Sequence, residues 1–452
     1  MTRFRLALLA VAPLALAACP PAPPARETAS VPPPRANPAD ARPLDTTPWQ
    51  IAGPSPAMCA RVDVGLTLPD GFCAVVVADS LGPVRHLDVS ASGDVYASLS
   101  GRRDGPAGVI ALRDADGDGR AEVRQKFENR AGSGLQIHDG WLYFAMNDGI
   151  VRWRLTPGQL VPQGQPELLV NGLPVGGHAS KALAFDGRGG MFVSIGSATN
   201  ACQEQDRQSR SAGRDPCPEL ATRAGIWRFD ANRANQAPAA GERWATGIRN
   251  GYALDFHRAA GVPFTVSHGR DNLSSNWGFT EQQNADVPAE EMFRLDRGTD
   301  GGWPYCYFDP GARRKVLAPE YGGNGTQVGR CTGMAAPAYA FPAHWAPNDL
   351  LFYTGTQLPP QYRGGAFVAF HGSWNRAPLP QQGFNVTFLP MTAAGAPSGP
   401  HSVFAQAPVP APGQQGGARH RPTGLAQGPD GSLYVSDDAG GRIWRIMYVG
   451  ER

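Results

Sequence analysis

The stretch "AFDGRGGMFVSIGS" at residues 184–197 decides the fold, because it combines a glycine-containing polar turn, an alternating apolar strand and a small, polar end. Short strands bounded by Gly, Asp and Asn recur along the chain, and no long segment shows the 3.6-residue period of a helix. The sequence therefore predicts a domain that is mostly β. The same layout recurs at residues 88–101, 136–153, 255–269, 361–373 and 426–446.

The spacing of these repeats indicates which β fold they form. The turn glycines Gly93, Gly140 and Gly189 are 47 and 49 residues apart, a period typical of a four-stranded propeller blade rather than of a β-sandwich. Six repeats predict an all-β fold, a six-bladed β-propeller over residues 49–452. We expect the strand around residues 71–78 to complete the last blade and close the ring.

Length and composition set the broad class. The chain has 452 residues, of which 42% are hydrophobic, so it can bury a large core. Its formal charge is only +2, and it contains no Lys/Arg-rich run. These observations argue against nucleic acid as a partner.

The N-terminus has the features of an export signal. Residues 1–19, "MTRFRLALLAVAPLALAAC", have a basic start, an apolar run and small residues before Cys19. The ending "LAAC" resembles the bacterial lipobox, which implies that Cys19 is lipid-modified; an ordinary cleaved signal peptide is the alternative. Residues 20–48 are rich in Pro and Ala and predict an extended linker. Because Pro20 rather than Asp follows the cysteine, we expect a periplasm-facing domain anchored to the outer membrane.

The cysteine count fits an exported lipoprotein. Seven cysteines become six once Cys19 carries lipid, and two pairs of them fall in long inserts at about residues 198–222 and 271–348. An oxidising periplasm favours three local disulfides. Metal binding by these thiols is the weaker alternative, because no C-x-x-C spacing occurs. The predicted pairs are Cys59 with Cys73, Cys202 with Cys217, and Cys306 with Cys331.

The segment "DADGDGRAE" at residues 114–122 is a candidate metal site. Asp114, Asp116 and Asp118 have the spacing of a calcium loop, with a glycine at the sharp turn. Position twelve is Gln125 instead of the bidentate Glu of an EF-hand, so the full motif fails. The segment is either a structural calcium site or a polar hairpin turn.

Polar residues stand at corresponding ends of the repeats. In a propeller the innermost strands converge on a central channel, and the loops at one mouth carry the function. Several basic groups at that mouth would form an anion site, since Arg pairs bidentately with carboxylate or phosphate. The alternative is that these arginines pair with Asp437 or Asp438 and hold the ring together. The residues concerned are His178, His268, His371, Arg419 and Arg421.

Six local motifs connect the chain to a known family. They are "GGHASKALAF", "GIRN", "SHGRDN", "GGWPYCY", "FHGSWNR" and "RHRPTG…GPDGSLYVSDD". With them, most of residues 65–448 resembles the bacterial sorbosone and aldose dehydrogenases that use pyrroloquinoline quinone (PQQ), a family that includes soluble quinoprotein glucose dehydrogenase. The resemblance implies a six-bladed propeller, in agreement with the repeats.

The resemblance also implies roles for individual residues. PQQ carries three carboxylates and an ortho-quinone, so it needs cationic anchors and an electrophilic group at the quinone oxygen, which arginines and calcium supply. His178 falls on the general base, which takes a proton from the substrate hydroxyl as hydride passes to the quinone. The backbone carbonyls of Gly269 and Arg270 fall on the calcium ligands, and Trp303 on an aromatic wall against sugar and cofactor. The implied cofactor contacts are Arg249, Asn250, Gly269, Arg270, His371, Arg419 and Arg421.

Three positions depart from the glucose-oxidising branch of this family. Gly177 replaces an acidic residue that precedes the base, His371 stands near the place of a cofactor-binding lysine, and Arg270 replaces a proline at the calcium turn. The motif "HGSWNR" fits the sorbosone-type branch better. Glucose specificity is therefore not carried over to this chain.

Together these features predict a membrane-tethered quinoprotein that oxidises an aldose or an aldehyde such as sorbosone. PQQ and calcium are the expected cofactors, and a respiratory acceptor receives the electrons. Two alternatives stay open: a non-catalytic propeller that binds an envelope polymer or protein, and a calcium-dependent lactonase on the same fold. The convergence of basic groups with His178 favours the dehydrogenase.

Overall fold

A computed structural model describes residues 58–59, 64–101, 105–411, 414 and 417–450. The predicted export signal, with Cys19, and the predicted linker at residues 20–48 lie outside this part of the chain, so both stay predictions. Within the described ranges, no helix combines the length and the hydrophobicity needed to cross a membrane.

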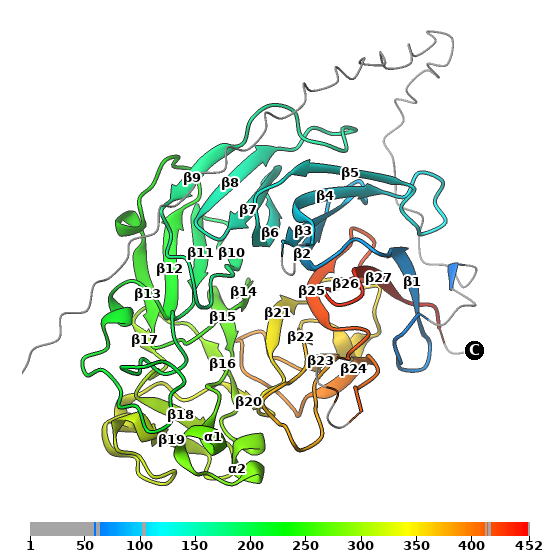
Figure 1. The fold of residues 1–452 in the computed structure, drawn as a ribbon. Coiled ribbons are helices and arrows are strands. Elements are labelled where there is room, and N and C mark those ends of the chain that lie inside the picture. The colour runs from blue at the N-terminus through cyan, green and yellow to red at the C-terminus, as the bar shows by residue number, and fades with distance from the viewer. Residues whose placement is uncertain (1–57, 60–63, 102–104, 412–413, 415–416, 451–452) are drawn as a thin grey trace, which may run out of the picture. The chain divides into compact units, whose positions relative to one another are not determined.

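Six sheets, each with four antiparallel blade strands, follow one another around a ring (Figure 1), and the third sheet includes a fifth, parallel strand from the second insert. The predicted all-β, six-bladed propeller is therefore confirmed. Blade 1 consists of β2 (Val84–Val89), β3 (Val95–Ser100), β4 (Ala107–Arg113) and β5 (Val123–Glu128). Blade 2 consists of β6 (Gly132–His138), β7 (Trp141–Met146), β8 (Gly149–Arg154) and β9 (Glu167–Asn171). Blade 3 consists of β10 (Leu183–Phe185), β11 (Gly190–Ile195), β12 (Gly225–Asp230) and β13 (Glu242–Thr246). Blade 4 consists of β14 (Ala253–His257), β15 (Val262–Ser267), β16 (Glu290–Arg294) and β20 (Tyr339–Phe341). Blade 5 consists of β21 (Pro347–Phe352), β22 (Ala366–Phe370), β23 (Asn385–Leu389) and β24 (Ser402–Gln406). Blade 6 consists of β25 (Pro422–Gln427), β26 (Leu433–Asp437), β27 (Arg442–Tyr448) and β1 (Phe72–Ala78).

The sequence repeats correspond to the blades one by one. Each repeat contains the second strand of a blade, namely β3, β7, β11, β15, β22 or β26. The turn glycines Gly93, Gly140 and Gly189 precede three of these strands with φ of +91°, +77° and +88°. This left-handed conformation explains why glycine recurs there, since a side chain would be strained.

The ring closes through a strand from the N-terminal side of the domain. β1 pairs antiparallel with β27, in a register that places Phe72 opposite Tyr448 and Ala74 opposite Ile446. The sixth blade thus combines three strands from the end of the domain with one from its beginning. The prediction for residues 71–78 is confirmed.

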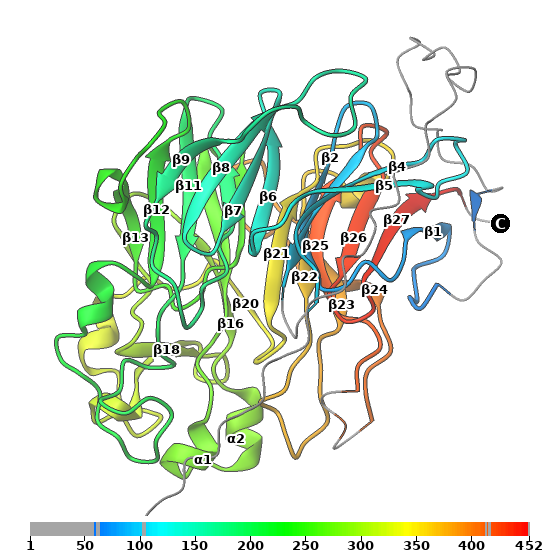
Figure 2. The same ribbon diagram turned by 45° about the horizontal axis from the view of Figure 1, so that its top comes forward.

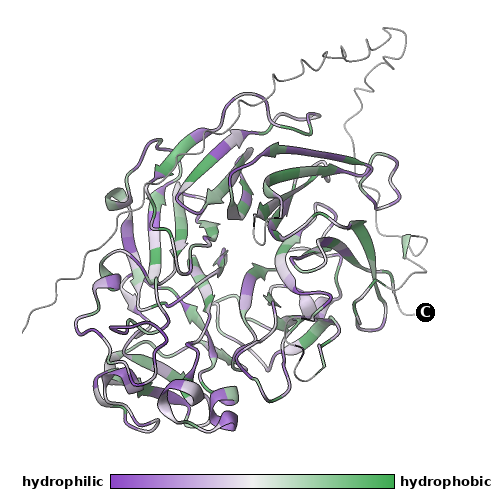
Figure 3. Ribbon diagram, in the orientation of Figure 1, coloured by the Kyte–Doolittle hydropathy of each residue, from purple (hydrophilic) through white to green (hydrophobic). Residues whose placement is uncertain are grey.

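The hydrophobic core lies between neighbouring blades. Val84 and Leu99 of blade 1 pack with Tyr434 and Ile443 of blade 6 in one buried cluster, and blades 4 and 5 share another. The blade strands carry most of the hydrophobic residues, whereas α2 is largely hydrophilic (Figure 3). The apolar alternation in each repeat therefore supplies the interfaces that hold the ring.

Buried carboxylates also join neighbouring blades. Asp88 of β2 accepts a hydrogen bond from the backbone N–H of Ile137 in β6 (2.7 Å), and Asp255 of β14 accepts one from Phe352 in β21 (2.8 Å). Asp349 bridges blades 5 and 6 in the same way. Burial raises the pKa of Asp88 and of Asp255 to about 6. These bonds satisfy backbone groups at the inner strands, where no sheet partner is available.

The two predicted inserts differ in how they relate to the blades. The first lies between β11 and β12, as expected. The second is interrupted, because residues 290–294 form the blade strand β16 and residues 339–341 form β20. The intervening pieces form α1 (Leu273–Trp277), α2 (Glu281–Asp286), β17 (Thr299–Asp300), β18 (Cys306–Asp309) and β19 (Arg314–Leu317).

The inserts gather at one side of the ring and are tied by disulfides. In Figure 2, α1, α2 and β18 lie together at one end of the strands of blades 3 and 4. Tyr321 of the second insert donates to the carbonyl of Ala201 in the first (3.2 Å). All three predicted disulfides are confirmed, with Cα–Cα distances of 5.6, 6.1 and 5.8 Å for Cys59–Cys73, Cys202–Cys217 and Cys306–Cys331.

Candidate active site

A cavity of about 540 Å³ lies where loops from several blades meet. The loops between β9 and β10, between β13 and β14, and after β15, β22 and β26 all contribute to its lining. Side chains far apart in the sequence are thus collected at one mouth of the propeller, as the repeat analysis predicts. Of the predicted site residues, the structure brings together His178, Arg249, Asn250, Gly269, His371 and Arg421.

His178 has a defined tautomer. Its Nδ1 lies 3.0 Å from both the backbone oxygen and the hydroxyl of Ser197. That hydroxyl donates its own proton to the carbonyl of Thr199 (2.7 Å), so both Ser197 oxygens act as acceptors. Nδ1 therefore carries the proton, and the lone pair of Nε2 is the proton acceptor of the ring.

The environment keeps this imidazole uncharged. Burial lowers the pKa of His178 to about 3, and the positive charge of Arg249 acts in the same direction. His268, which also lines the cavity, has its pKa lowered by burial to about 3. The ring of His178 is therefore neutral and unprotonated at Nε2 near pH 7.

The departure at Gly177 has a steric explanation. Gly177 has φ of +57°, and a Cβ added there would lie 2.3 Å from the carbonyl oxygen of Ala198. A Cβ on Gly196 would likewise lie 2.6 Å from the Cβ of His178. Residues 196–198 thus pack directly against the histidine, and Ser197 orients its ring in place of an acidic neighbour.

Arg249 connects the cavity wall to the first insert. Its guanidinium donates to the carbonyl oxygens of Asn200 (3.0 Å) and Gly269 (2.8 Å), and to a carboxylate oxygen of Asp271 (3.0 Å). Burial raises the pKa of Asp271, but the charges of Arg249 and Arg207 outweigh this and hold it at about 2. Asn250 follows in the chain, and its carbonyl accepts from the backbone N–H of His268 (3.0 Å).

A second polar chain crosses the cavity wall between blades 5, 6 and 1. Arg421 donates to Nδ1 of His371 (3.1 Å), and Nε2 of His371 donates to Asp438 (2.6 Å). Arg85 donates to the other oxygen of Asp438 (2.6 Å). Burial raises the pKa of Asp438, but His371 and Arg85 reverse this and hold it below its ordinary range. The predicted alternative of an arginine paired with Asp438 is thus found, although the arginine is Arg85.

The cavity lining carries an excess of positive charge. Burial lowers the pKa of each of its four histidines, and it raises the pKa of Glu290 to about 8, so these groups are neutral near pH 7. Two ionised carboxylates, Asp271 and Asp438, remain. The lining thus has four guanidinium groups and two ionised carboxylates, an excess of positive charge that suits an anionic ligand. The guanidinium groups belong to Arg85, Arg207, Arg249 and Arg421.

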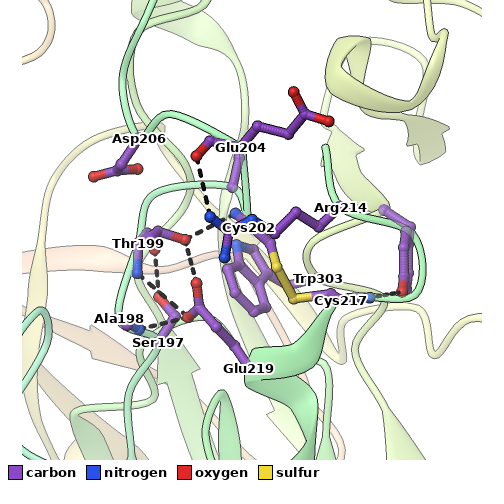
Figure 4. Close-up of a disulfide and its surroundings, with 12 residues drawn as sticks. Ser197, Ala198, Thr199, Cys202, Glu204, Asp206, Arg214, Cys217, Glu219 and Trp303 are labelled. Atoms are coloured by element: carbon purple, nitrogen blue, oxygen red, sulfur yellow. Dashed lines mark hydrogen bonds between the residues drawn. A yellow bond between two sulfur atoms is a disulfide. The ribbon is translucent and has the colours of Figure 1, made fainter. Parts of the chain in front are cut away.

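Three predicted site residues lie apart from this cavity. Arg419 is exposed and is absent from the lining, although Arg421 two positions later belongs to it. Arg270 is buried and forms an ion pair with Glu320. Trp303 lies beside the Cys202–Cys217 disulfide (Figure 4), and its indole N–H donates to the carbonyl of Asn200 (2.9 Å). The motifs identified the right loops, but side-chain direction depends on packing that they do not encode.

The predicted calcium ligands meet a different partner. The carbonyl of Gly269 faces the cavity side, but it accepts from the guanidinium of Arg249 (2.8 Å). The side chain of Arg270 turns away and donates to the carbonyl of Asp271. The Gly269 carbonyl is thus already an acceptor for a guanidinium, and calcium binding at Gly269 and Arg270 stays a prediction.

Several lining residues escaped the sequence analysis. Trp374 lies within "FHGSWNR" and is 50% exposed, unlike Trp303, which is 6% exposed. Arg207 reaches the cavity from the first insert, with its guanidinium 5.8 Å from the indole centre of Trp374. Arg85 precedes the first repeat. Of these three residues, only Trp374 stood in a quoted motif; Asp271, another lining residue, stood in "SHGRDN".

The acidic loop at residues 114–122 lies between β4 and β5, outside the cavity lining. Asp114, Asp116 and Asp118 group with Glu122, each with a carboxylate oxygen within 4.8 Å of the others. Asp114 already accepts from the backbone N–H groups of Gly117 (2.7 Å) and Gly119 (2.9 Å). Both interpretations of this loop, a calcium site and a polar hairpin turn, are compatible with this geometry, and calcium binding stays a prediction.

The chain belongs to the TrAA12-like family, whose family model matches residues 66–449. It is 26% identical over 232 residues to the pyrroloquinoline quinone-dependent pyranose dehydrogenase of Coprinopsis cinerea, a match that covers 44% of this chain and 30% of the relative. The chain spans less than half the length of the curated relatives that it matches.

Solved structures show the same fold. The holo form of the PQQ domain of the C. cinerea pyranose dehydrogenase superposes with a TM-score of 0.69 at 21% identity, covering 88% of this chain and all of that domain. A calcium structure of a Trichoderma reesei enzyme of carbohydrate-active family AA12 gives a TM-score of 0.71 at 19% identity, covering 89% and 99%. At these identities the likeness concerns the propeller itself.

The tautomer of His178 can be tested by NMR. In ¹⁵N-histidine-labelled protein, we expect His178 to stay neutral between about pH 5 and 8 with its proton on Nδ1, because its pKa is lowered to about 3. A His178→Gln variant identifies the resonances. A midpoint near the ordinary histidine pKa of about 6.5, or a proton on Nε2, would contradict the account of the site.

Proposed function

We propose that this chain is a quinoprotein sugar dehydrogenase that oxidises a pyranose or another aldose, or an aldehyde such as sorbosone, with His178 as the general base. The observation that carries the proposal is the coincidence of two features in one cavity. The Nε2 lone pair of His178 and an excess of positive charge share the same lining. A protein that only binds a polymer needs no such base.

The residues present fit PQQ. A cavity of about 540 Å³ accommodates a flat tricarboxylate together with a monosaccharide. Arg421 and Arg85 are the side chains we expect to hold its carboxylates, since guanidinium groups pair bidentately with such groups. His371 keeps Arg421 and Asp438 in position through its two ring nitrogens. Similarity to the pyrroloquinoline quinone-dependent pyranose dehydrogenase of C. cinerea, and to the holo form of its PQQ domain, supports this assignment.

The chemistry divides between cofactor and protein. When bound, PQQ supplies the quinone that accepts the hydride. His178 takes the proton from the hydroxyl on the carbon that is oxidised, since Ser197 fixes its ring and leaves Nε2 as the acceptor. Its neutral state leaves the Nε2 lone pair unprotonated at neutral pH. Arg249 lies beneath this site as a rigid support, bonded to Asn200, Gly269 and Asp271.

Trp374 is the side chain we expect to bind the sugar ring. Its indole is half exposed at the cavity, and aromatic faces pack well against the apolar face of a pyranose. Arg207 lies against the same indole and holds Asp271 (3.0 Å). This pair takes the role that the sequence analysis gave to Trp303.

Calcium remains part of the proposal. Asp271 and Glu290 line the cavity beside Gly269, and carboxylates and carbonyls are the ligands that calcium prefers. Glu290 is neutral near pH 7 in the ion-free protein, so it would lose its proton on binding calcium. Glu290 already accepts from the backbone N–H groups of Gly269 (2.7 Å) and Ala346 (2.9 Å), which fixes its position. The calcium structure of the T. reesei relative supports a role for this ion.

The dehydrogenase proposal is tested by reconstitution. Purified protein with calcium and PQQ should reduce a dye with pyranoses, other aldoses or aldehydes as substrate. His178→Ala should lower kcat by about 10²- to 10⁴-fold, the usual contribution of a general base, and leave the PQQ dissociation constant within about threefold. Absence of PQQ binding by the unmodified protein would refute the proposal, and full activity of His178→Ala would refute the role of the base.

Two neighbouring arginines give a matched test of the anion site. Arg421→Ala should weaken PQQ binding about ten- to a hundredfold, because a charge-assisted hydrogen bond is lost. Arg419→Ala removes the same charge at an exposed position outside the cavity lining, so its PQQ affinity should stay within about twofold. Equal affinity of both variants in a fluorescence titration would contradict the assignment.

We also propose that the mature protein is held at the outer membrane by lipid on Cys19, facing the periplasm, and passes its electrons to a respiratory acceptor. The support is the lipobox-like ending "LAAC" of the apolar leader. A Cys19→Ala protein should leave the membrane fraction, because its anchor is lost. Continued partition of this variant with membranes would count against lipidation.

A further inference from the structure

The segment Cys217–Arg223, here called the clamp segment, contacts both chain segments that position His178. It contains a short 3₁₀ helix, Pro218–Ala221, at the end of the first insert. One of the contacted segments is residues 174–179, the loop that carries His178. The other is residues 196–199, which carries Ser197. No residue of the clamp segment lines the cavity.

Glu219 of the clamp segment fixes the residues that follow Ser197. Its carboxylate accepts from the backbone N–H groups of Ala198 (2.6 Å) and Thr199 (3.3 Å), and from the hydroxyl of Thr199 (Figure 4). Thr199 in turn provides the carbonyl to which the Ser197 hydroxyl donates. Glu219 therefore determines where the acceptors for Nδ1 of His178 stand.

Arg223 fixes the loop that carries the base. Its guanidinium donates to the carbonyl oxygens of Val175 and Gly176 (3.2 Å for the latter). Its backbone N–H donates to the carbonyl of Glu219 (2.8 Å), so the two side chains belong to one turn. Both halves of the His178–Ser197 contact are thus held by residues only four positions apart.

The loop needs such support from outside. Gly176 and Gly177 have φ of +80° and +57°, and glycines lose more freedom than other residues when they are ordered. Val175 beside them is 55% exposed, so little apolar burial holds this part of the loop. Hydrogen bonds to the carbonyls of Val175 and Gly176 are therefore a main restraint on its path.

The Cys202–Cys217 disulfide attaches the clamp segment to the residues that it holds. Cys217 begins the clamp segment, and Cys202 lies three residues after Thr199. The backbone N–H of Cys202 donates to the hydroxyl of Thr199 (2.9 Å). Figure 4 shows the disulfide next to Thr199 and Glu219. The covalent bond and the carboxylate contacts therefore close a small loop around the support of His178.

We infer that Glu219, Arg223 and the Cys202–Cys217 disulfide are positioning elements that aim Nε2 of His178 at the reacting hydroxyl. This inference rests on the proposed function, because it assigns His178 the role of base. Proton transfer tolerates little displacement, and a shift of about 1 Å can cost about a hundredfold in rate. The first insert thus serves catalysis through the geometry of the base.

Hydrogen exchange of the cofactor-free protein tests the restraint itself. The variants are Glu219→Ala, Arg223→Met and the double variant Cys202→Ser/Cys217→Ser. We expect exchange in the peptide covering residues 174–182 to accelerate at least about tenfold in each, because the loop loses a restraint. The matched control is Cys59→Ser/Cys73→Ser, which removes a disulfide of nearly equal sequence separation, 14 against 15, at β1. The control should leave this peptide unchanged.

Kinetics of the PQQ- and calcium-loaded variants test the consequence for the base. In the three clamp variants we expect kcat to fall about ten- to a hundredfold, with KM and the PQQ dissociation constant within about threefold. Arg223→Lys, which keeps a cationic donor group but loses the two-nitrogen fork, should recover part of the rate. The control variant should keep the kcat of the unmodified protein, and in a His178→Ala background the clamp substitutions should have no further effect on kcat.

Two results would overturn the inference. One is unchanged exchange of residues 174–182 in all three clamp variants. The other is a loss of rate that is matched by an equal loss of PQQ affinity, or that persists in full in the His178→Ala background, since either would indicate general damage. If the unmodified protein shows no turnover, the proposed function fails, whereas the exchange measurement still decides whether the clamp segment restrains the loop.

Discussion

The pairing of β1 with β27 is the constraint on which the rest of the structure depends. Blade 6 combines three strands from the end of the domain with β1 from its beginning, so this pairing joins both ends of the domain in one sheet and closes the ring. Once closed, each blade is fixed by two neighbours through apolar clusters such as the one shared by blades 1 and 6. The loops at the mouth then have fixed starting points, and their side chains meet at one cavity.

The site follows from this convergence. Arg85 from blade 1, His371 from blade 5 and Asp438 from blade 6 form one hydrogen-bonded chain that no single blade could supply. Nearby, Arg249 and Asp271 tie the inserts to the wall. The positive charge that remains is the product of burial, which neutralises the histidines and Glu290 but leaves the guanidinium groups charged.

The sequence predicted the features that depend on local pattern. The turn glycines and strand alternation are encoded within repeats of 13 to 21 residues, so six blades and the closing strand could be inferred from them. The motifs also led to the right loops, hence to His178, Arg249, His371 and Arg421. The predicted second insert was too long, because the five residues of β16, EEMFR, show no alternation of apolar and polar residues and form a strand by pairing with β15.

Side-chain direction and steric exclusion could not be predicted. Arg419 and Arg421 are two positions apart, yet only Arg421 lines the cavity. Trp303 is buried in a cluster with the Cys202–Cys217 and Cys306–Cys331 disulfides, whereas Trp374 is half exposed at the cavity. From the sequence, Gly177 left His178 without an acidic neighbour to orient its ring. In the structure, the absence of a side chain at Gly177 lets Ala198 pack against it, which places Ser197 beside His178. Each of these features depends on contacts between residues of different blades or with an insert, which a local sequence pattern does not contain.

A crystal structure of the protein grown with PQQ and calcium tests the central claim most directly. The account predicts PQQ inside the cavity, with a carboxylate bound by Arg421 and its quinone carbonyl on the side of Nε2 of His178. PQQ bound outside this cavity, or with its quinone on the side away from His178, would contradict the account.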